Sequence, residues 1–221
     1  MRLRLLAAGA ALVVLATSGC EAETPDYHSV WSTTPSTTAT STADQPPVPL
    51  SVYLEQNGVQ GELIAPDKLT DLIVTMPAPP GWTSYENPNL APGTHAIAKN
   101  NAYPMAMLLV FRLTGDFDVN EAINHGYVDA EASENFKRLN ASTDNWKGFP
   151  SSMIEGSYDL NGRRMHSYNR IVIPTGSPPG NARYLVQFTV TGYAEKAAEE
   201  APELESIIGG FNVAVPPAPK K

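Results

Sequence analysis

The sequence predicts an α+β domain, a sandwich in which helices cover a mainly antiparallel β-sheet. Three observations favour this fold class. Segments rich in β-branched and apolar residues follow one another in the second half of the chain, which favours pairing between sequence neighbours. Two of these segments flank Asn161-Gly162, the strongest short signal for a β-hairpin. Segments with helical spacing of apolar residues are grouped before, between and after the strands, which is typical of α+β domains.

The first half of the domain is expected to contain one short helix and three strands. Residues 50–57 predict the helix. Residues 72–76 predict a strand, because Pro77 follows and cannot continue it. Residues 94–99 predict a second strand. Residues 105–113 form an almost continuous apolar run, as expected for a central strand that is buried on both faces.

The second half is expected to begin with the longest helix, at residues 118–138. Apolar residues recur there at helical spacing, and Asp118 is a candidate N-cap. Strands are predicted on both sides of the Asn161-Gly162 turn and again farther along the chain. A last helix is expected to open on Pro202 and to precede a final strand that closes the sheet. The predicted ranges are 151–159, 163–173 and 184–191 for the strands, 203–208 for the helix and 211–215 for the final strand.

The predicted hairpin also determines which side chains share a face. With Asn161-Gly162 as a two-residue loop, Asp159 pairs with Arg164, and the register follows outward along both strands. Because side chains alternate along a strand, the paired residues lie on one face, which is polar, charged and aromatic, whereas the other face is mostly packable. We take the polar face as the candidate recognition surface, and its residues are Asp159, Arg164, His166, Tyr168 and Arg170.

This surface has two interpretations. In the first, it is a solvated sheet face on which cross-strand charge pairs add stability. In the second, it is a recognition surface, because Arg and Tyr are frequent anchors at interfaces. Helices on both sides of the sheet would cover part of this face and turn it into the wall of a cleft.

The N-terminus predicts export. Arg2 and Arg4 precede a short apolar run, and small residues lead to Cys20, which is the pattern of a secretory signal over residues 1–19. The apolar run is too short to span a bilayer. The pattern resembles a bacterial lipobox, although Thr17 stands where leucine is usual, so we expect Cys20 to carry the acyl chains that anchor the protein. The alternative is an ordinary signal peptide with an incidental cysteine, but Cys20 is the only cysteine and has no disulfide partner.

Composition divides the mature chain into three parts. Residues 20–49 are rich in Ser, Thr and Pro and predict a disordered tether behind the lipidated cysteine. Residues 50–215 have the size of one domain, and residues 216–221 predict a disordered tail. The net charge of −8 argues against binding to nucleic acid and against electrostatic docking on anionic lipid. Membrane attachment is therefore expected to depend on the acyl chains.

No motif identifies a reaction, a cofactor or a metal. The spacings typical of zinc sites, nucleophile elbows and phosphate-binding loops do not occur in the sequence. Asp116 and Asp118 could form a cation site, but a turn followed by a helix cap is the simpler interpretation. A hydrolytic site that combines a serine with a histidine is left open, and the residues concerned are Ser151, Ser152, His125 and His166.

Several longer segments are distinctive. The lipobox-like N-terminus and the Ser/Thr/Pro-rich tether are followed by TMPAPPGW, YPMAMLLVFRLTGDFD and GFPSSMIEGSYDLNGRRMHSYNRIVIPTGSPP. Together these segments resemble the mycobacterial LpqN/LpqT lipoprotein family over almost the whole chain. The resemblance implies an α/β/α sandwich like that of the photosystem protein PsbP and the nuclear-import factor Mog1, which are binding proteins. It supplies no catalytic residues.

These observations favour an exported, lipid-anchored binding module at the outer face of the cell membrane or in the cell envelope. The expected ligand is a protein or an envelope glycolipid, and no cofactor, metal ion or nucleic acid is expected. The alternatives are an envelope hydrolase, favoured only by the compartment, and a passive surface antigen or structural spacer. An apolar cavity would favour lipid binding, whereas a histidine hydrogen-bonded to Ser or Asp in a cleft would favour hydrolysis.

Overall fold

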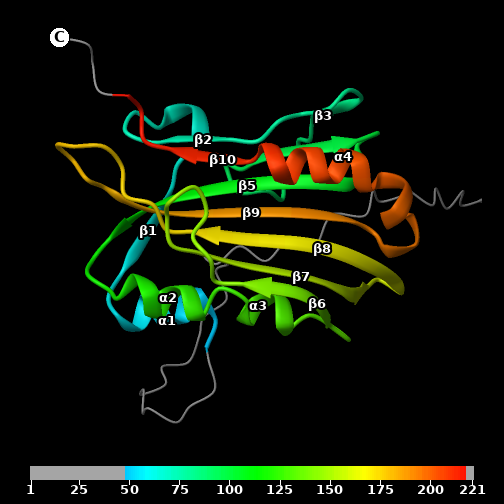
Figure 1. Cartoon of the computed structure of the whole chain (residues 1–221), viewed down its shortest axis with the longest axis horizontal. Coiled ribbons are helices and arrows are strands. Elements are labelled where there is room, and N and C mark those ends of the chain that lie inside the picture. Colours follow the sequence, from blue (N-terminus) through cyan, green and yellow to red (C-terminus); the bar gives the residue numbers. More distant parts are fainter. Residues whose placement is uncertain (1–47, 218–221) are drawn as a thin grey trace, which may run out of the picture.

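The computed structural model of the chain describes residues 48–217. The predicted signal peptide, Cys20 and the tether up to residue 47 lie outside the described residues, as do residues 218–221 of the predicted tail. The described part is built around one large sheet (Figure 1). In chain order, its elements are α1 (Leu50–Gln56), β1 (Gln60–Leu63), η1 (Pro66–Lys68), β2 (Ile73–Thr75), β3 (Trp82–Ser84), β4 (His95–Lys99), β5 (Ala102–Thr114), α2 (Val119–Asn124), α3 (Val128–Glu131), β6 (Lys137–Ser142), β7 (Ser151–Leu160), β8 (Arg163–Val172), β9 (Arg183–Tyr193), η2 (Ala194–Lys196), α4 (Ala197–Gly210) and β10 (Asn212–Ala214).

The large sheet has eight strands and confirms the prediction of a mainly antiparallel sheet. Its order is β3-β4-β5-β9-β8-β7-β6, and β1 pairs with the end of β5 that β4 leaves free. All of its strand pairs are antiparallel. β2 and β10 form a separate two-stranded antiparallel sheet.

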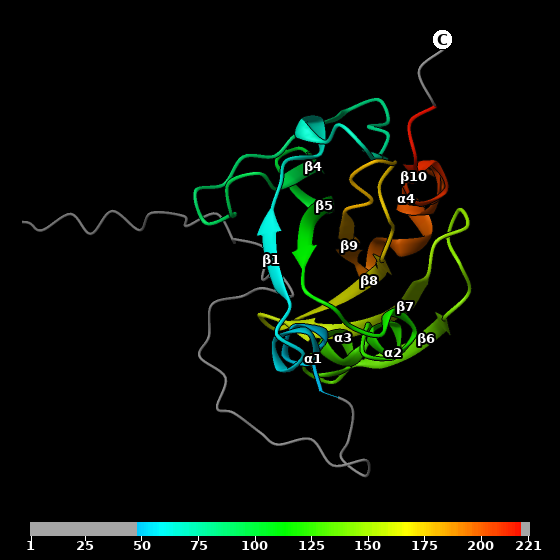
Figure 2. The same cartoon turned by 90° about the vertical axis from the view of Figure 1, so that its left-hand side faces the viewer.

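Helices lie on both faces of the large sheet, so the fold is the α/β/α sandwich that the family resemblance implied. Figure 2 shows α1, α2 and α3 on one side of the sheet, and α4 with β10 on the other. We call these the α1–α3 side and the α4 side. Within residues 48–217, no helix is long and apolar enough to cross a membrane.

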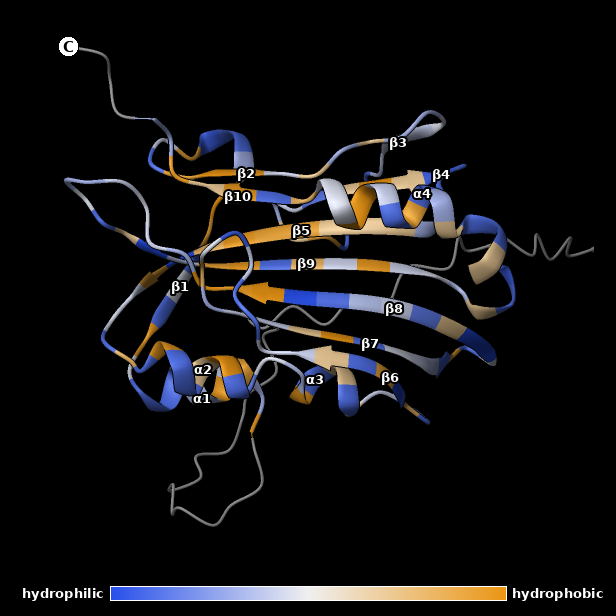
Figure 3. Cartoon of the chain, viewed as in Figure 1, coloured by the Kyte–Doolittle hydropathy of each residue, from blue (hydrophilic) through white to orange (hydrophobic). Residues whose placement is uncertain are grey.

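The long strand β5 contributes to two hydrophobic cores, because its side chains point alternately to the two sides of the sheet. Those that face the α4 side are Ala106, Leu108 and Val110, and those that face the α1–α3 side are Met105, Met107, Leu109 and Phe111. All of them are almost fully buried, which confirms the prediction of a central strand buried on both faces. Figure 3 shows β5 as mostly hydrophobic, whereas β8 is largely hydrophilic.

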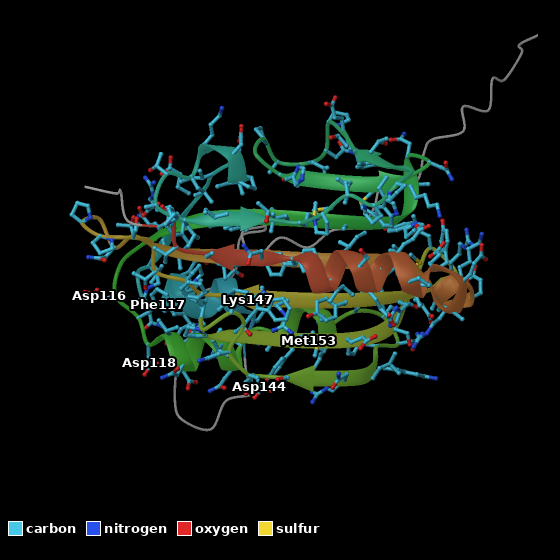
Figure 4. The ribbon with its side chains drawn as sticks, turned by 45° about the horizontal axis from the view of Figure 1, so that its top comes forward. Asp116, Phe117, Asp118, Asp144, Lys147 and Met153 are labelled. Atoms are coloured by element: carbon cyan, nitrogen blue, oxygen red, sulfur yellow. The ribbon has the colours of Figure 1, made fainter. Side chains whose placement is uncertain are left out.

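The predicted helix at 118–138 is wrong in its extent. The chain forms the two short helices α2 and α3 there and then enters the sheet as β6. The helical spacing does not account for Gly126, which approaches Ser152 so closely that a Cβ would overlap the serine hydroxyl. The cap is correct: Asp118, labelled in Figure 4, accepts hydrogen bonds from the backbone N–H groups of Asn120 and Glu121 at 2.8 and 3.1 Å.

The C-terminal elements also differ from the prediction. The last helix, α4, begins six residues before 203, so Pro202 lies inside it rather than in its first turn. Pro202 is exposed, and the helix packs on the sheet through Leu204 and Ile207 instead. The predicted final strand at 211–215 forms as β10, but it pairs with β2 rather than closing the large sheet. β1, β3 and β6 are strands that the sequence did not predict.

Candidate functional site

The β7–β8 hairpin has the register that the sequence predicts. Asn161 and Gly162 form the two-residue loop with φ angles of 49° and 75°, the left-handed values that a type I′ turn requires. The predicted pairs are Asp159 with Arg164, Ser157 with His166, Glu155 with Tyr168 and Met153 with Arg170, and all are present. The prediction that these side chains share a face is therefore confirmed, and that face is the α4 side.

Two residues of the candidate recognition surface are not exposed. Tyr168 is 8% exposed and Arg170 is 7% exposed, so the expectation of an open surface is wrong at this end of the hairpin. The reason is that Trp146 stacks against Phe211 and also lies over the Arg170 guanidinium, whose carbon is 4.2 Å from the ring centroid. The residues that keep intermediate exposure are Asp159, Arg164 and His166. Their role in recognition stays a prediction.

At its open end, the hairpin face carries matched charges. Arg164 Nη1 donates to Asp159 Oδ1 at 3.0 Å, and His166 Nε2 lies 3.0 Å from Glu155 Oε1. Hydrogen bonds from Arg164 and then from Asn135 hold the pKa of the Asp159 carboxyl below its ordinary value. This pairing fits the first interpretation, a sheet face whose charges are balanced by their neighbours.

The other side of the same strands bears a cavity of about 380 Å³. It lies between the segment 126–134, which contains α3, and the strands β7, β8 and β9. The sequence predicts that most of this face packs against a hydrophobic core. The residues that line the cavity are Gly126, Asp129, Ala130, Ala132, Ser133, Glu134, Tyr158, Asp159, Leu160, Asn161, Ser167, Asn169, Ile171, Gln187, Thr189 and Thr191.

The floor of the cavity is made of polar side chains from β8 and β9. Their cross-strand pairs are Ser167 with Thr191, Asn169 with Thr189, and Ile171 with Gln187. Thr189 Oγ1 donates to Asn169 Oδ1 at 3.1 Å, and Asn169 Nδ2 donates to Ser167 Oγ at 3.2 Å. Ser167, Gln187, Thr189 and Thr191 are buried, so uncharged hydrogen-bonding groups occupy positions where a sandwich normally has apolar core.

Two close contacts hold the segment that covers the cavity. At its start, Gly126 lies against Ser152, whose buried Oγ has no hydrogen-bond partner within residues 48–217. Just after it, the ring of Phe136 lies directly over Gly156 of β7, where a Cβ would overlap the ring. Each contact requires a glycine, so the wall of the cavity is positioned by packing rather than by helix propensity.

The cavity favours neutral ligands that carry many hydroxyl groups. The acidic residues Asp129 and Glu134 belong to its lining, which includes no Lys, Arg or His. The lining therefore disfavours anions. Hydroxyl and amide side chains can both donate and accept, which suits polyhydroxyl compounds. An apolar cavity would favour binding of a lipid acyl chain, whereas the polar floor of this cavity is better suited to a headgroup.

Within the described residues, neither candidate serine, Ser151 or Ser152, is hydrogen-bonded to His125 or His166. Ser151 pairs with Val172 and Ser157 pairs with His166, so Ser151 and His166 lie about 20 Å apart along the hairpin. Ser152 points to the opposite side of the sheet from His166, as the alternation requires. The ring nitrogens of His125 approach the Val48 carbonyl at 2.7 Å and Glu121 at 3.6 Å. In the part of the chain that is described, no group of three or more His, Cys, Asp or Glu could hold a metal ion.

Sequence reasoning missed the cavity, although β9 carried a signal for it. Gln187, Thr189 and Thr191 alternate with Val186, Phe188 and Val190, so one face of a buried strand is polar. The pattern alone cannot place these residues beside Ser167 and Asn169, because that requires the β8–β9 register, which no short turn determines.

Comparison with known proteins gives consistent matches. A family model described as "Probable lipoprotein LpqN" matches residues 46–214. Putative lipoprotein LpqT of Mycobacterium tuberculosis is 54% identical over 213 residues, which cover 96% of this chain and 94% of that protein. The crystal structure of LpqN, "involved in cell envelope biogenesis of Mycobacterium tuberculosis", matches with a TM-score of 0.66 at 17% identity and covers 78% of this chain and all of that one. The structure of PsbP from Synechocystis matches with a TM-score of 0.43 at 10% identity, and the match covers 66% of this chain and 94% of the PsbP chain. The structure of Mog1p from Saccharomyces cerevisiae matches with a TM-score of 0.39 at 10% identity, and the match covers 70% of this chain and 95% of the Mog1p chain.

Proposed function

The chain belongs to the LpqN family of probable lipoproteins, and from this premise we propose that it is a lipid-anchored binding protein of the cell envelope. Its ligand is a neutral polyhydroxyl group, such as the sugar headgroup of an envelope glycolipid. The binding site is the cavity between α3 and the strands β7 to β9. The protein holds this ligand without transforming it.

The observation that carries the proposal is the polar floor of the cavity. Burying hydroxyl and amide groups costs free energy unless they find hydrogen-bond partners, so a fold that needs only a core has no use for them. Asn169 lies at the centre of the floor and is held by Ser167 and Thr189. A pre-ordered row of donors and acceptors in a recess is what recognition of sugar hydroxyls requires.

A binding experiment with two amphiphiles that share one tail tests the headgroup. We expect dodecyl maltoside, below its critical micelle concentration, to bind the full chain with saturation in isothermal titration calorimetry. Dodecylphosphocholine has the same tail and a zwitterionic headgroup without hydroxyl groups, and we expect it to bind at least about tenfold more weakly, because the site is built for neutral hydroxyls.

Variants of the floor locate the site. Asn169→Ala should weaken dodecyl maltoside binding about tenfold, since it removes the central hydrogen-bonding group. Thr189→Val, which keeps the shape of the side chain, should weaken it in the same direction. Asn145→Ala, at an exposed loop position, is the matched control and should bind like the wild type. Equal affinity for both amphiphiles, or unchanged binding by Asn169→Ala, would refute the proposal.

Anchorage is tested at Cys20, which lies outside the described residues. Cys20→Ala should abolish incorporation of labelled fatty acid and move the protein from the membrane fraction to the soluble fraction. Ser18→Ala, two residues away, should keep both the label and the membrane association. Persistence of Cys20→Ala protein in the membrane fraction with an unchanged mature mass would show that the cysteine is not the anchor.

A further inference from the structure

Arg170 is a buried cation whose charge is not matched by a carboxylate. Its side chain lies on the α4 side of β8 and is 7% exposed. By contrast, Arg164 forms an ion pair with Asp159, and Arg138 forms one with Glu131. No carboxylate of residues 48–217 lies within ion-pair distance of Arg170, whose contacts are with hydroxyls and aromatic rings. Charged side chains are rarely buried unless they are paired.

Most of the hydrogen-bonding capacity of Arg170 is unused. Nε donates to Tyr168 Oη at 2.7 Å, and Nη1 donates to Ser151 Oγ at 2.9 Å. A guanidinium has five N–H groups. Those of Arg170 that are not used in these two hydrogen bonds have no acceptor within the described residues. The unused groups are on the Nη1 and Nη2 end, which is the edge of the guanidinium that matches a carboxylate in two parallel hydrogen bonds.

A strained turn completes the surroundings of this cation. Trp146 and Phe149 exchange backbone hydrogen bonds at 2.9 and 3.0 Å around Lys147 and Gly148, whose φ angles are 53° and 89°. A lysine is unusual at such a φ angle, which glycine or asparagine adopts more easily. The turn places the Trp146 ring over Arg170, and the buried Trp146 Nε1 is a second donor without an acceptor in the described part of the chain. Figure 4 shows Lys147 and Asp144 on this loop, near Met153 of β7, which pairs with Arg170.

We propose that Arg170 and the Trp146 turn form a receptor for a single carboxylate group of an organic ligand. One guanidinium balances one negative charge. Glu155, one position along the same face from Met153, already pairs with His166 and disfavours a second negative charge, so a phosphate monoester is a poorer fit. This receptor is on the opposite side of the sheet from the proposed sugar site, so either can fail without the other.

Titration with acetate tests the receptor directly. The full chain is labelled with ¹⁵N, and the indole N–H signal of Trp146 is assigned by its absence in Trp146→Phe. We expect sodium acetate to shift this signal with saturation, whereas sodium chloride at the same ionic strength leaves it unchanged. Identical drifts in both salts would overturn the proposal, and so would a saturating response to phosphate with none to acetate.

Two arginine variants separate the receptor from general charge. Arg170→Gln keeps hydrogen-bonding groups but removes the cation, and it should weaken acetate binding by about tenfold or more. Arg163→Gln removes a cation on the same strand that already has a carboxylate partner, Glu195, and it should leave acetate binding unchanged. Acetate affinity that is unaltered by Arg170→Gln would overturn the proposal. If Arg170→Gln does not fold, the comparison of acetate with chloride on the wild-type chain decides.

Discussion

Replacing Tyr168 by alanine is expected to lower the free energy of unfolding by about 3–5 kcal/mol, as truncation of a buried aromatic side chain does. Tyr168 is 8% exposed, and its ring lies edge-on to Phe188 with centroids 6.2 Å apart. Its hydroxyl also accepts the hydrogen bond from Arg170 Nε at 2.7 Å. The variant therefore loses packing and leaves a buried charged donor without its acceptor.

Thermal and urea denaturation measure this effect. For a domain of this size, the expected loss corresponds to a fall in Tm of about 6–20 °C. Tyr168→Phe is the matched control, since it keeps the ring and removes only the hydroxyl, and its loss should be about 1–3 kcal/mol. An open sheet face would instead give a change within about 0.5 kcal/mol for Tyr168→Ala. That smaller result would show that the Trp146 turn does not cover the hairpin in solution.

The contrast at Tyr168 shows what the hairpin sequence could and could not predict. Asn161-Gly162 determines the loop length, and the loop length determines every pair from Asp159 with Arg164 outward. That inference is local, and it is correct. Exposure is not local: Tyr168 and Arg170 are buried by Trp146 and Phe211, and no short-range pattern places these two rings over the hairpin.

The prediction of a single helix over residues 118–138 is wrong for a related reason. Its apolar residues have helical spacing, but the spacing carries no information about the strand against which the segment packs. Gly126 and Phe136 each fit against one residue of β7, and those two contacts break the segment into α2, α3 and β6. Tertiary packing outweighs helix propensity here, as it commonly does for short helices. The cavity depends on the same segment, so its position could not be predicted either.

Replacing Gly156 by alanine is the second change with a large expected effect. A methyl group at this position would overlap the Phe136 ring and would lie 2.8 Å from the backbone carbonyl oxygen of Lys137. The ring could rotate, but the carbonyl belongs to β6, so the strand itself must move. Overpacking of this kind costs typically about 1–3 kcal/mol, and displacement of a strand places the expected loss at the upper end of that range.

The same variant should also weaken ligand binding, because Phe136 lies two residues after Glu134, the last residue of the segment that forms the wall of the cavity. Gly209→Ala is the matched control: it makes the same chemical change in α4, where an added Cβ meets nothing within 4 Å, and it should leave stability unchanged or raise it by up to about 1 kcal/mol. Combining Gly156→Ala with Phe136→Ala should recover part of the stability by removing the overlap, a coupling that a double-mutant cycle measures. Wild-type melting of Gly156→Ala would mean that Phe136 does not rest on β7, and the wall of the proposed binding site would then lack its support.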